Sequence, residues 1–287
     1  MNPDRRPGAA AIADKGWLAA HRWLILRRVS QAGFLALFIT GPLFGYWLAK
    51  GTLASSLTLN VLPLTDPLFL LQSIAAGHRP EAAAIVGAGI VLAFYGLIGG
   101  RGFCAWVCPV NPLTDGAHWL RRRLGLGSAL RLDRRLRYWL LGAVVAVAAI
   151  MGTVVWEAVN PVTLLHRGLI FGTIFGFGMA SVVVASVILF DLALTERGWC
   201  GHVCPVGAFY AVIGRFRLLR VAAPSRARCD QCRDCYLVCP EPHVIVPALT
   251  APPGADSAIR AIDCTSCGRC IDVCPHNVFA FSIGGKS

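Results

Sequence analysis

The sequence predicts an all-α membrane protein in which four transmembrane helices form two repeated hairpins, followed by a small cysteine-rich domain. Three observations predict this fold class: four long apolar stretches, a motif repeated at the end of two of them, and eight cysteines in two blocks near the C-terminus. Of the 287 residues, 56% are hydrophobic and only 15% are charged, a balance that excludes an ordinary soluble domain.

The apolar stretches are long enough to cross a bilayer, because about 20 helical residues span a hydrocarbon core of about 30 Å. None contains a charged side chain, and they cover residues 29–49, 82–100, 138–156 and 169–190. The connection between the first two, 51–81, is leucine-rich but is interrupted by polar residues and prolines. Unpaired backbone groups are not tolerated in lipid, so we expect this connection at the outer surface, with a short amphipathic helix at 68–76.

Basic side chains are distributed unevenly around these stretches. Of the 27 Lys and Arg residues, 6 precede the first stretch, 8 lie between the second and third, and 10 follow the fourth, whereas the two remaining connections hold 2 and 1. Because basic residues accumulate on the cytoplasmic side, we expect a multi-pass protein of the bacterial inner membrane with both termini in the cytoplasm. The net charge of +12 is therefore a topology signal, and we expect no nucleic-acid partner.

The eight C-terminal cysteines form two copies of one pattern. CDQCRDCYLVCP and CTSCGRCIDVCP both have the spacing C-x2-C-x2-C-x3-C-P, which is the bacterial ferredoxin pattern for a pair of 4Fe–4S clusters. In such pairs the fourth cysteine of each run binds the other cluster. The expected ligands are, for cluster 1, Cys229, Cys232, Cys235 and Cys274, and, for cluster 2, Cys264, Cys267, Cys270 and Cys239. Two zinc sites are the alternative, because C-x2-C pairs also bind zinc.

A second cysteine motif is repeated where the second and fourth apolar stretches end. GRGFCAWVCPVNP and ERGWCGHVCPVGA share Arg-Gly and the spacing C-x3-C-P. Residues four apart on a helix share a face, so Cys104 and Cys108 are expected to point together, as are Cys200 and Cys204. The four thiolates are candidates for a third cluster or metal site or for a redox-active dithiol pair. Buried, inert thiols are the alternative.

These features divide the chain into three parts. We expect residues 1–28 to form a basic cytoplasmic tail, residues 29–220 a four-span membrane domain with both C-x3-C-P motifs, and residues 221–287 a ferredoxin-like domain with two 4Fe–4S clusters. A region as short as the last has little hydrophobic core of its own, so we expect the clusters to hold it together.

Polar residues gather at the predicted outer end of the third stretch. Glu157, Asn160 and His166 lie in WEAVNPVTLLHR, at the edge of the membrane. A carboxylate and a histidine beside lipid suit the oxidation of quinol, because two protons must leave as two electrons depart. We therefore take these residues as quinol-site candidates, with ordinary interfacial polar residues as the alternative.

Several segments together resemble the NapH family, the ferredoxin-type membrane subunits of periplasmic nitrate reductase systems. They are HRWLILRR, PLTDPL, FCAWVCPVNPLTD, WEAVNPV, RGWCGHVCPVGA and CPEPHV, and the likeness covers residues 16–281. PLTDPL and CPEPHV favour NapH over the methylamine-utilisation ferredoxin-type proteins, which share the C-x3-C-P layout. The resemblance implies four spans, two 4Fe–4S clusters, and oxidation of quinol to supply a periplasmic NapG-like iron–sulfur partner and, through it, nitrate reductase.

The predicted role is therefore that of a membrane electron-transfer subunit, a component of a quinol dehydrogenase and not a complete enzyme. The haem attachment motif C-x2-C-H does not occur in the sequence. One alternative is a membrane iron–sulfur redox sensor or assembly factor. Another is the related electron-transfer protein of methylamine utilisation.

Overall fold

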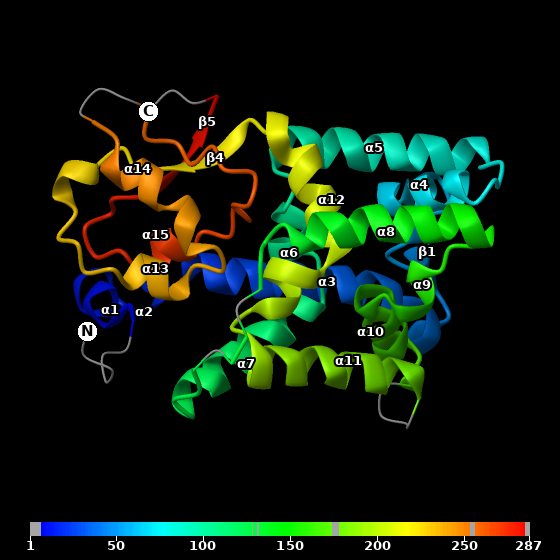
Figure 1. Ribbon diagram of the computed structural model, residues 1–287, viewed down its shortest axis with the longest axis horizontal. Coiled ribbons are helices and arrows are strands. Elements are labelled where there is room, and N and C mark those ends of the chain that lie inside the picture. The colour runs from blue at the N-terminus through cyan, green and yellow to red at the C-terminus, as the bar shows by residue number, and fades with distance from the viewer. Residues whose placement is uncertain (1–6, 128, 131, 174–177, 253–255, 285–287) are drawn as a thin grey trace. The chain divides into compact units, whose positions relative to one another are not determined.

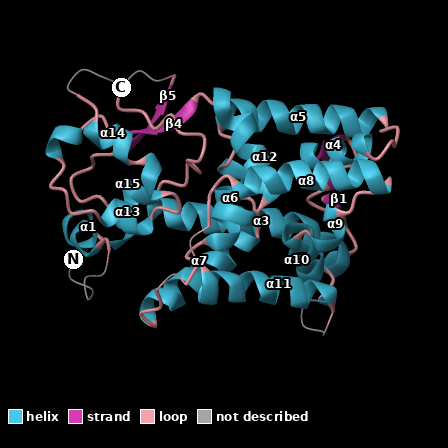
Figure 2. Cartoon of the chain, in the orientation of Figure 1, coloured by secondary structure: helices cyan, strands magenta, loops and turns pink. Residues whose placement is uncertain are grey.

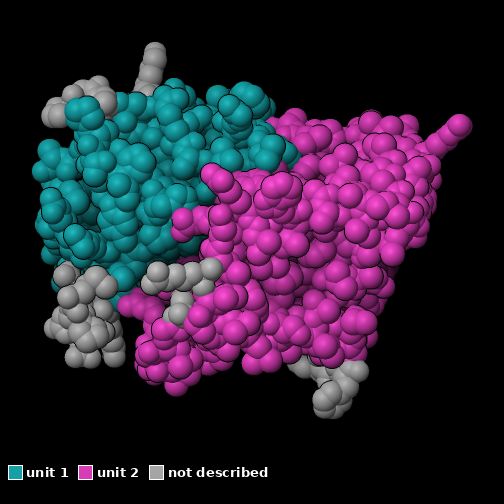
Figure 3. Space-filling view, in the orientation of Figure 1, with its two compact units in different colours: residues 1–30, 95–106, 211–287 teal, residues 31–94, 107–210 magenta. Residues whose placement is uncertain are grey.

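The computed structural model divides into two compact units. It describes residues 7–127, 129–130, 132–173, 178–252 and 256–284. Unit 1 comprises residues 1–30, 95–106 and 211–287, and unit 2 comprises residues 31–94 and 107–210 (Figure 3). Helices predominate in the described part of both units (Figures 1 and 2).

Unit 2 contains most of the apolar helices. It includes α3 (Arg22–Phe44) without its first turns and α5 (Ala82–Ile98) without its last turn. Its other helices are α4 (Pro67–Ala75), α7 (Val110–Arg123), α8 (Leu136–Met151), α9 (Trp156–Val159), α10 (Pro161–Ile170), α11 (Met179–Leu189) and the greater part of α12 (Pro205–Ile213). Within the unit, α4 contacts α8, and α10 contacts α11.

The apolar helices differ in length from the predicted spans. Among the described residues, α3 is the one helix that is long and apolar enough to cross a membrane, with 23 residues. α5, α8 and the stretch Met179–Leu194 are apolar but have 10–17 residues. The predicted span 138–156 is cut short because Gly152, with a φ of +66°, ends α8. The predicted span 169–190 includes residues 174–177, which lie outside the described residues, and α11 begins only at Met179.

A small antiparallel sheet follows α3, which the all-α prediction does not include. Its strands β1 (Ala49–Gly51), β2 (Ser55–Thr58) and β3 (Leu62–Thr65) pair in the order β1-β2-β3. Leu59 and Asn60 both have a positive φ and turn the chain between β2 and β3. Strands of three or four residues give too little alternation to be recognised in the sequence. The helix predicted at 68–76 is present as α4.

The helices α4 and α10 begin in the same way. Asp66 caps α4 by accepting a hydrogen bond from the backbone N–H of Leu68, and a proline follows it at the first helical position. Asn160 caps α10 by accepting from the N–H of Val162, and a proline again follows. An Asx cap with proline at the first position is a favoured helix start. The internal repeat seen in the cysteine motifs therefore extends to these two helices.

Unit 1 joins the N-terminal helices to the C-terminal region. Its elements are α1 (Ala9–Lys15), α2 (Trp17–Ala20), α6 (Gly102–Trp106), β4 (Leu219–Ala222), α13 (Asp234–Val238), α14 (Val246–Thr250), α15 (Arg269–Val273) and β5 (Ala280–Ile283). β4 and β5 pair antiparallel, which ties the two ends of the C-terminal region together. The core of this region contains apolar side chains and four of its cysteines, Cys235, Cys264, Cys270 and Cys274.

The N-terminal segment of unit 1 is bonded to the cysteine-rich region. The backbone N–H of Gly8 donates to Asp234 over 2.9 Å. The N–H groups of Trp23 and Leu24 donate to the two carboxylate oxygens of Asp272 over 3.1 and 2.9 Å. These two carboxylates satisfy backbone groups that would otherwise lack partners at the starts of helical segments.

Candidate metal centre

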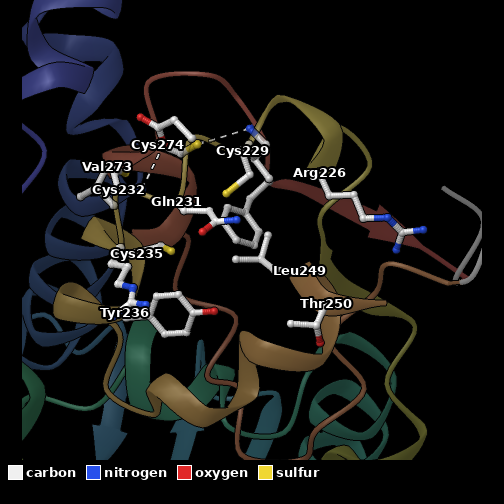
Figure 4. Close-up of a pocket in the computed structure, with 14 residues that line it drawn as sticks. Arg226, Cys229, Gln231, Cys232, Cys235, Tyr236, Leu249, Thr250, Val273 and Cys274 are labelled. Carbon is white, nitrogen blue, oxygen red and sulfur yellow. Dashed lines mark hydrogen bonds between the residues drawn. The ribbon is translucent and has the colours of Figure 1, made fainter. Parts of the chain in front are cut away.

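Four cysteines line a cavity of about 340 Å³ in unit 1 (Figure 4). Three belong to the first cysteine run, namely Cys229, Cys232 and Cys235, and the fourth, Cys274, ends the second run. Cys235 lies on α13 and Cys274 directly follows α15, so the contact between these two helices brings the two runs together. The cavity is lined by the set expected to hold cluster 1.

A second, smaller cavity of about 20 Å³ is lined by the other four cysteines. Cys239 follows α13 and closes the first run, while Cys264, Cys267 and Cys270 come from the second. This is the set expected to hold cluster 2. The crossed arrangement follows from the lengths of α13 and α15, because each helix carries the chain from its third cysteine to a fourth that lies beside the other run.

Both cysteine runs bend through the same backbone conformation, with a positive φ on either side of the middle cysteine. Around the middle cysteine of the first run, Gln231 and Arg233 have positive φ values of 57° and 64°. Around that of the second run, Ser266 and Gly268 have values of 48° and 73°. Left-handed residues on either side of a cysteine bend the backbone sharply, so that three cysteines in C-x2-C-x2-C spacing face one space. An added Cβ at Gly268 would lie 2.5 Å from the Trp23 ring, which explains glycine there.

The chemistry of the first cavity fits a cluster that carries positive metal charge. Burial, with a smaller contribution from the neighbouring thiolates, raises the pKa of Cys235 to about 12. Four bare thiolates are therefore unfavourable in this space, whereas iron ions would stabilise them. No disulfide joins any of the twelve cysteines, all of which are described. In the described residues, no three His, Cys, Asp or Glu side chains are placed to hold one ion; a 4Fe–4S cluster instead takes one cysteine at each iron.

The C-x3-C-P cysteines do not share helix faces as predicted. Cys104 lies on α6 in unit 1, whereas Cys108 follows the end of that helix and belongs to unit 2. Cys200 lies in a π-helical turn (Trp199–Val203), and Cys204 directly follows that turn. The helical ladder is interrupted in both copies because a proline follows the second cysteine and cannot continue it. In unit 2, the hydroxyl of Thr114 lies 3.9 Å from the Cys200 sulfur.

The structure brings two of the three quinol-site candidates together. The side-chain amide of Asn160 donates to the Glu157 carboxylate over 3.2 Å and to the Thr163 hydroxyl over 3.1 Å. Thr163 in turn donates to Glu157. Asn160 is buried, and its carbonyl oxygen caps α10, so this group is held rigidly at the helix start. Thr163 is a member of the group that the sequence did not single out.

His166 lies apart from this group, further along α10. Its side chain is only 1% exposed and meets the Phe38 ring edge to face, with ring centres 4.5 Å apart. Neither ring nitrogen has a hydrogen-bond partner among the described residues. Burial lowers the pKa of His166 to about 4, so the imidazole is neutral at pH 7. Gln72, which occupies the matching position on α4, is equally buried, and its amide oxygen likewise has no partner in the described part of the chain.

Two further polar contacts were not predicted. Arg101, in the first C-x3-C-P motif, forms a 2.8 Å ion pair with Glu241 of the CPEPHV segment, which lines the second cavity. The hydroxyl of Tyr210 donates to Asp66 over 3.1 Å. Two sequence features could have pointed to the Arg101–Glu241 pair: Arg101 belongs to a repeated motif, and Glu241 directly follows Cys239 and Pro240. Nothing in the sequence, however, indicates that residues so far apart are in contact.

Comparisons with known proteins agree with this chemistry. A family described as 4Fe-4S dicluster domain matches residues 228–278, which contain both cysteine runs. A family described as 4Fe-4S binding domain matches residues 82–127 and 169–222, which contain the two C-x3-C-P motifs. NapH of Escherichia coli (strain K12), a ferredoxin-type protein, is 46% identical over 100% of this chain and 99% of its own length. The chain belongs to the NapH family of ferredoxin-type proteins. The resemblance inferred from the motifs is thus confirmed.

Within the NapH family, the chain is an iron–sulfur electron-transfer protein. NapH of Haemophilus influenzae is also 46% identical, over 98% of this chain and 96% of its own. MauN of Methylorubrum extorquens, a methylamine utilization ferredoxin-type protein, is 48% identical over 97% and 95%. MauN is therefore as similar to the chain as NapH is, and the preference for NapH drawn from PLTDPL and CPEPHV does not separate the two along the whole chain. No solved structure matches the chain.

Proposed function

We propose that this chain oxidises membrane quinol and relays the electrons through two 4Fe–4S clusters. The receiving chain would begin with a periplasmic NapG-like iron–sulfur protein and lead to nitrate reductase. The observation that carries the proposal is the pair of cavities in unit 1, each lined by four cysteines drawn from both runs. A 4Fe–4S cluster held by four thiolates is a one-electron carrier. The chain is thus a component of a quinol dehydrogenase, and reduction of nitrate belongs to other proteins.

The ligands of the two clusters are part of this proposal. The lining of the first cavity supports one set as the ligands of cluster 1, and the lining of the second supports the other set as those of cluster 2. The protein's part is to fix the eight sulfurs and to limit water around them, since ligands of both sets are buried. The sets are Cys229, Cys232, Cys235 and Cys274 for cluster 1, and Cys239, Cys264, Cys267 and Cys270 for cluster 2.

We further propose a four-span arrangement in the bacterial inner membrane, with both termini in the cytoplasm. The supporting observations are α3, which is long enough to span, three shorter apolar helices, and the uneven distribution of basic residues. The corresponding parts are the tail 1–28, the membrane domain 29–220 and the ferredoxin-like domain 221–287. A reporter enzyme that is active only outside the cytoplasm should be active when fused after Lys50 or Arg167. The same reporter should be inactive when fused after Arg123 or Ser287.

Quinol would bind near Glu157, Asn160 and His166. Oxidation of a quinol releases two protons, so its site needs groups that accept hydrogen bonds from, and take protons off, two hydroxyls. Glu157 supplies a carboxylate held by Asn160, and His166 supplies a neutral imidazole whose nitrogens have no partner among the described residues. Buried polar atoms of this kind are costly unless another molecule satisfies them.

A third metal or cluster site at Cys104, Cys108, Cys200 and Cys204 is also proposed. It is supported by the match of a family described as 4Fe-4S binding domain to both segments that carry these cysteines. Serine at Cys104 and Cys200 should lower the iron content or slow electron flow from quinol. Unchanged values for both variants would remove this site.

A second candidate function is electron transfer in methylamine utilisation. It is favoured by the similarity to MauN, which is 53% identical in Paracoccus denitrificans over 83% of this chain. Both candidates use the same clusters and differ in the protein that receives the electrons. Reoxidation of the reduced chain by a NapG-like protein, compared with reoxidation by proteins of a methylamine-oxidising system, distinguishes them.

The test of the main proposal uses the whole chain, purified anaerobically in detergent. We expect about eight irons and eight inorganic sulfides for the two ferredoxin-type clusters, with more if the third site holds a cluster. Adding a quinol together with the NapG-like partner should bleach the visible absorbance of the clusters and produce their reduced EPR signals. Zinc without sulfide would defeat the cluster assignment. Clusters that dithionite reduces and quinol does not would defeat the quinol assignment.

A further inference from the structure

Three arginines of unit 1 are buried around the second ligand set. Arg27, Arg101 and Arg217 are only 1%, 2% and 2% exposed. Arginine is almost never fully buried unless other groups stabilise its charge, because removing a guanidinium from water is costly. Their position beside a site made of four thiolates is therefore a feature that requires explanation.

Backbone carbonyls fix two of these guanidiniums just before the first ligand of the second run. Arg217 donates to the carbonyl oxygens of Ile259 and Ala261 over 3.0 and 2.7 Å. Arg101 donates to the carbonyl oxygen of Asp263 over 2.8 Å and to Glu241 over the same distance. A carbonyl holds a guanidinium in place without cancelling its charge. The charge of Arg217 is thus less neutralised than that of Arg101.

The arginines lie beside residues that line the second cavity. Arg217 is bonded to the backbone carbonyl of Ile259 and Arg101 is paired with Glu241, and both Ile259 and Glu241 line that cavity. Arg269 lines the cavity itself, and Arg27 lies one helical turn after Trp23, whose ring lies against Gly268 of the second run. The nearby carboxylates are occupied elsewhere: Glu241 pairs with Arg101, Asp263 with His243, and Asp272 with backbone N–H groups.

The first ligand set has the opposite surroundings. Asp230 lines the first cavity and accepts a hydrogen bond from the backbone N–H of Cys232 over 3.2 Å, and the buried Asp234 directly precedes Cys235. Two arginines line the first cavity, but Arg233 is exposed and Arg226 is half-buried, so water screens their charge. Figure 4 shows the Arg226 guanidinium directed away from the labelled cysteines. The charges around the two sites therefore favour added negative charge at the second site over the first, and burial leaves the arginine charges at the second site little screened by water.

We propose that the cluster held by Cys239, Cys264, Cys267 and Cys270 has the higher reduction potential of the pair, and that Arg217 is the main residue that raises it. On reduction, a 4Fe–4S cluster with four thiolates takes up one electron and its charge changes from −2 to −3. A fixed guanidinium in a buried site stabilises the more negative form, and net charge and burial are known determinants of cluster potential. Arg217 is thus a positioning and tuning residue. At equilibrium, an electron that reaches the two clusters would therefore be found mainly on the cluster at the second site.

The test is an anaerobic redox titration of the whole protein in detergent, followed by EPR, with dithionite and mediators setting the potential. The wild type should show two reduction steps. Arg217→Gln should lower the higher step, so that the ratio of reduced to oxidised cluster at a fixed potential falls about tenfold, equivalent to about 59 mV for one electron. Arg217→Lys keeps the charge and should restore most of the shift. Arg260→Gln, at an exposed arginine of the same region, is the matched control and should change neither step.

This inference rests on the ligand sets proposed above, and the two fail differently. Iron and sulfide are measured first, and a wild type without clusters would defeat the assignment of the site itself. If the clusters are present and Arg217→Gln leaves both steps in place, or lowers the lower step, the inference is overturned. If the Arg217→Gln protein loses iron, Arg27→Gln is the second variant, and it too should lower the higher reduction step. The absence of a shift there would overturn the inference equally.

Discussion

Arg101 donates a 2.8 Å hydrogen bond to Glu241, and both side chains are almost completely buried. Burial alone lowers the pKa of Arg101, but the Glu241 carboxylate raises it above its usual range, so the guanidinium stays charged. The pair connects the arginine of the first C-x3-C-P motif to the glutamate that follows Cys239 and Pro240. It holds together two segments of unit 1 that are distant in sequence.

Removal of Arg101 should therefore destabilise unit 1. Arg101→Gln removes the charge that lies 2.8 Å from the buried Glu241 carboxylate, a change that costs about 3 to 5 kcal/mol in comparable buried pairs. We expect a lower thermal unfolding temperature and a loss of iron on purification. Arg101→Gln combined with Glu241→Gln should recover part of the loss.

The control for this prediction is the exposed pair of Arg260 and Asp256. Arg260→Gln should cost less than about 1 kcal/mol, because water already stabilises both charges. Equal effects of the two arginine variants would show that the buried pair has no special role.

Crossed ligation predicts which cysteine variants resemble each other. Cys274→Ser should remove the same EPR signal as Cys232→Ser, although the two residues belong to different runs, because both line the first cavity. Cys239→Ser should remove the same signal as Cys264→Ser, since both line the second. Each pair is the control for the other. If Cys274→Ser resembles Cys264→Ser instead, the ligands follow the runs and the crossed assignment is wrong.

His166 should be needed for reduction by quinol but not for the clusters themselves. His166→Leu removes the buried imidazole and keeps an apolar side chain against Phe38. We expect reduction of the clusters by quinol to slow at least tenfold while reduction by dithionite stays unchanged. His21→Gln, at a histidine stacked on Trp17 in unit 1, is the matched control and should reduce normally. A normal rate of quinol reduction in His166→Leu would exclude this histidine from the site.

Ionisation of the Asp66 carboxyl group should make unit 2 less stable as the pH rises. Burial and, to a smaller extent, the Glu157 carboxylate raise its pKa to about 6, against the hydrogen bonds from Leu68 and Tyr210, which favour the ionised form. A carboxyl whose pKa is raised in the folded protein stabilises it fully below about pH 4, and this contribution is lost as the pH rises through about 6. Asp66→Asn keeps the helix cap and should gain stability over the wild type as the pH rises from 5 to 7.

The measurement is the difference in unfolding temperature between wild type and Asp66→Asn at each pH. His166 contributes with the opposite sign, because its pKa is lowered to about 4 and its stabilising contribution is lost as the pH falls below about 6.5. Both proteins contain His166, so its contribution cancels in the difference. A constant difference for Asp66→Asn would contradict the prediction.

Much of the local structure follows from neighbouring residues. The helix predicted at 68–76 is found as α4 because an Asx cap, a proline and an apolar run specify it within a few positions. The apolar helices are also found, but three of them are shorter than the predicted spans, and α8 is short because Gly152 ends it before the hydropathy falls. The β1–β3 sheet was missed, since strands this short depend on their partners and not on their own pattern.

The site was predictable in part. Cysteine spacing alone grouped the eight ferredoxin-type cysteines, and the two cavities are lined by the same groups. The helical faces expected for the C-x3-C-P cysteines were wrong, because a π-turn and a helix end replace the regular helix there. Thr163 beside Glu157 was missed because a threonine in a helix gives no sign of which carboxylate it will meet.

By itself, the sequence determined the ligand types, their spacing and the apolar segments, because these depend on residues that are close along the chain. Only the tertiary structure decided that Arg217 and Arg101 lie beside Cys264 and that His166 is enclosed against Phe38. Such contacts join residues far apart in sequence, and their energies depend on burial, which no local pattern specifies. The same cysteine run would bind a cluster with or without these neighbours; the folded chain determines the charge around it.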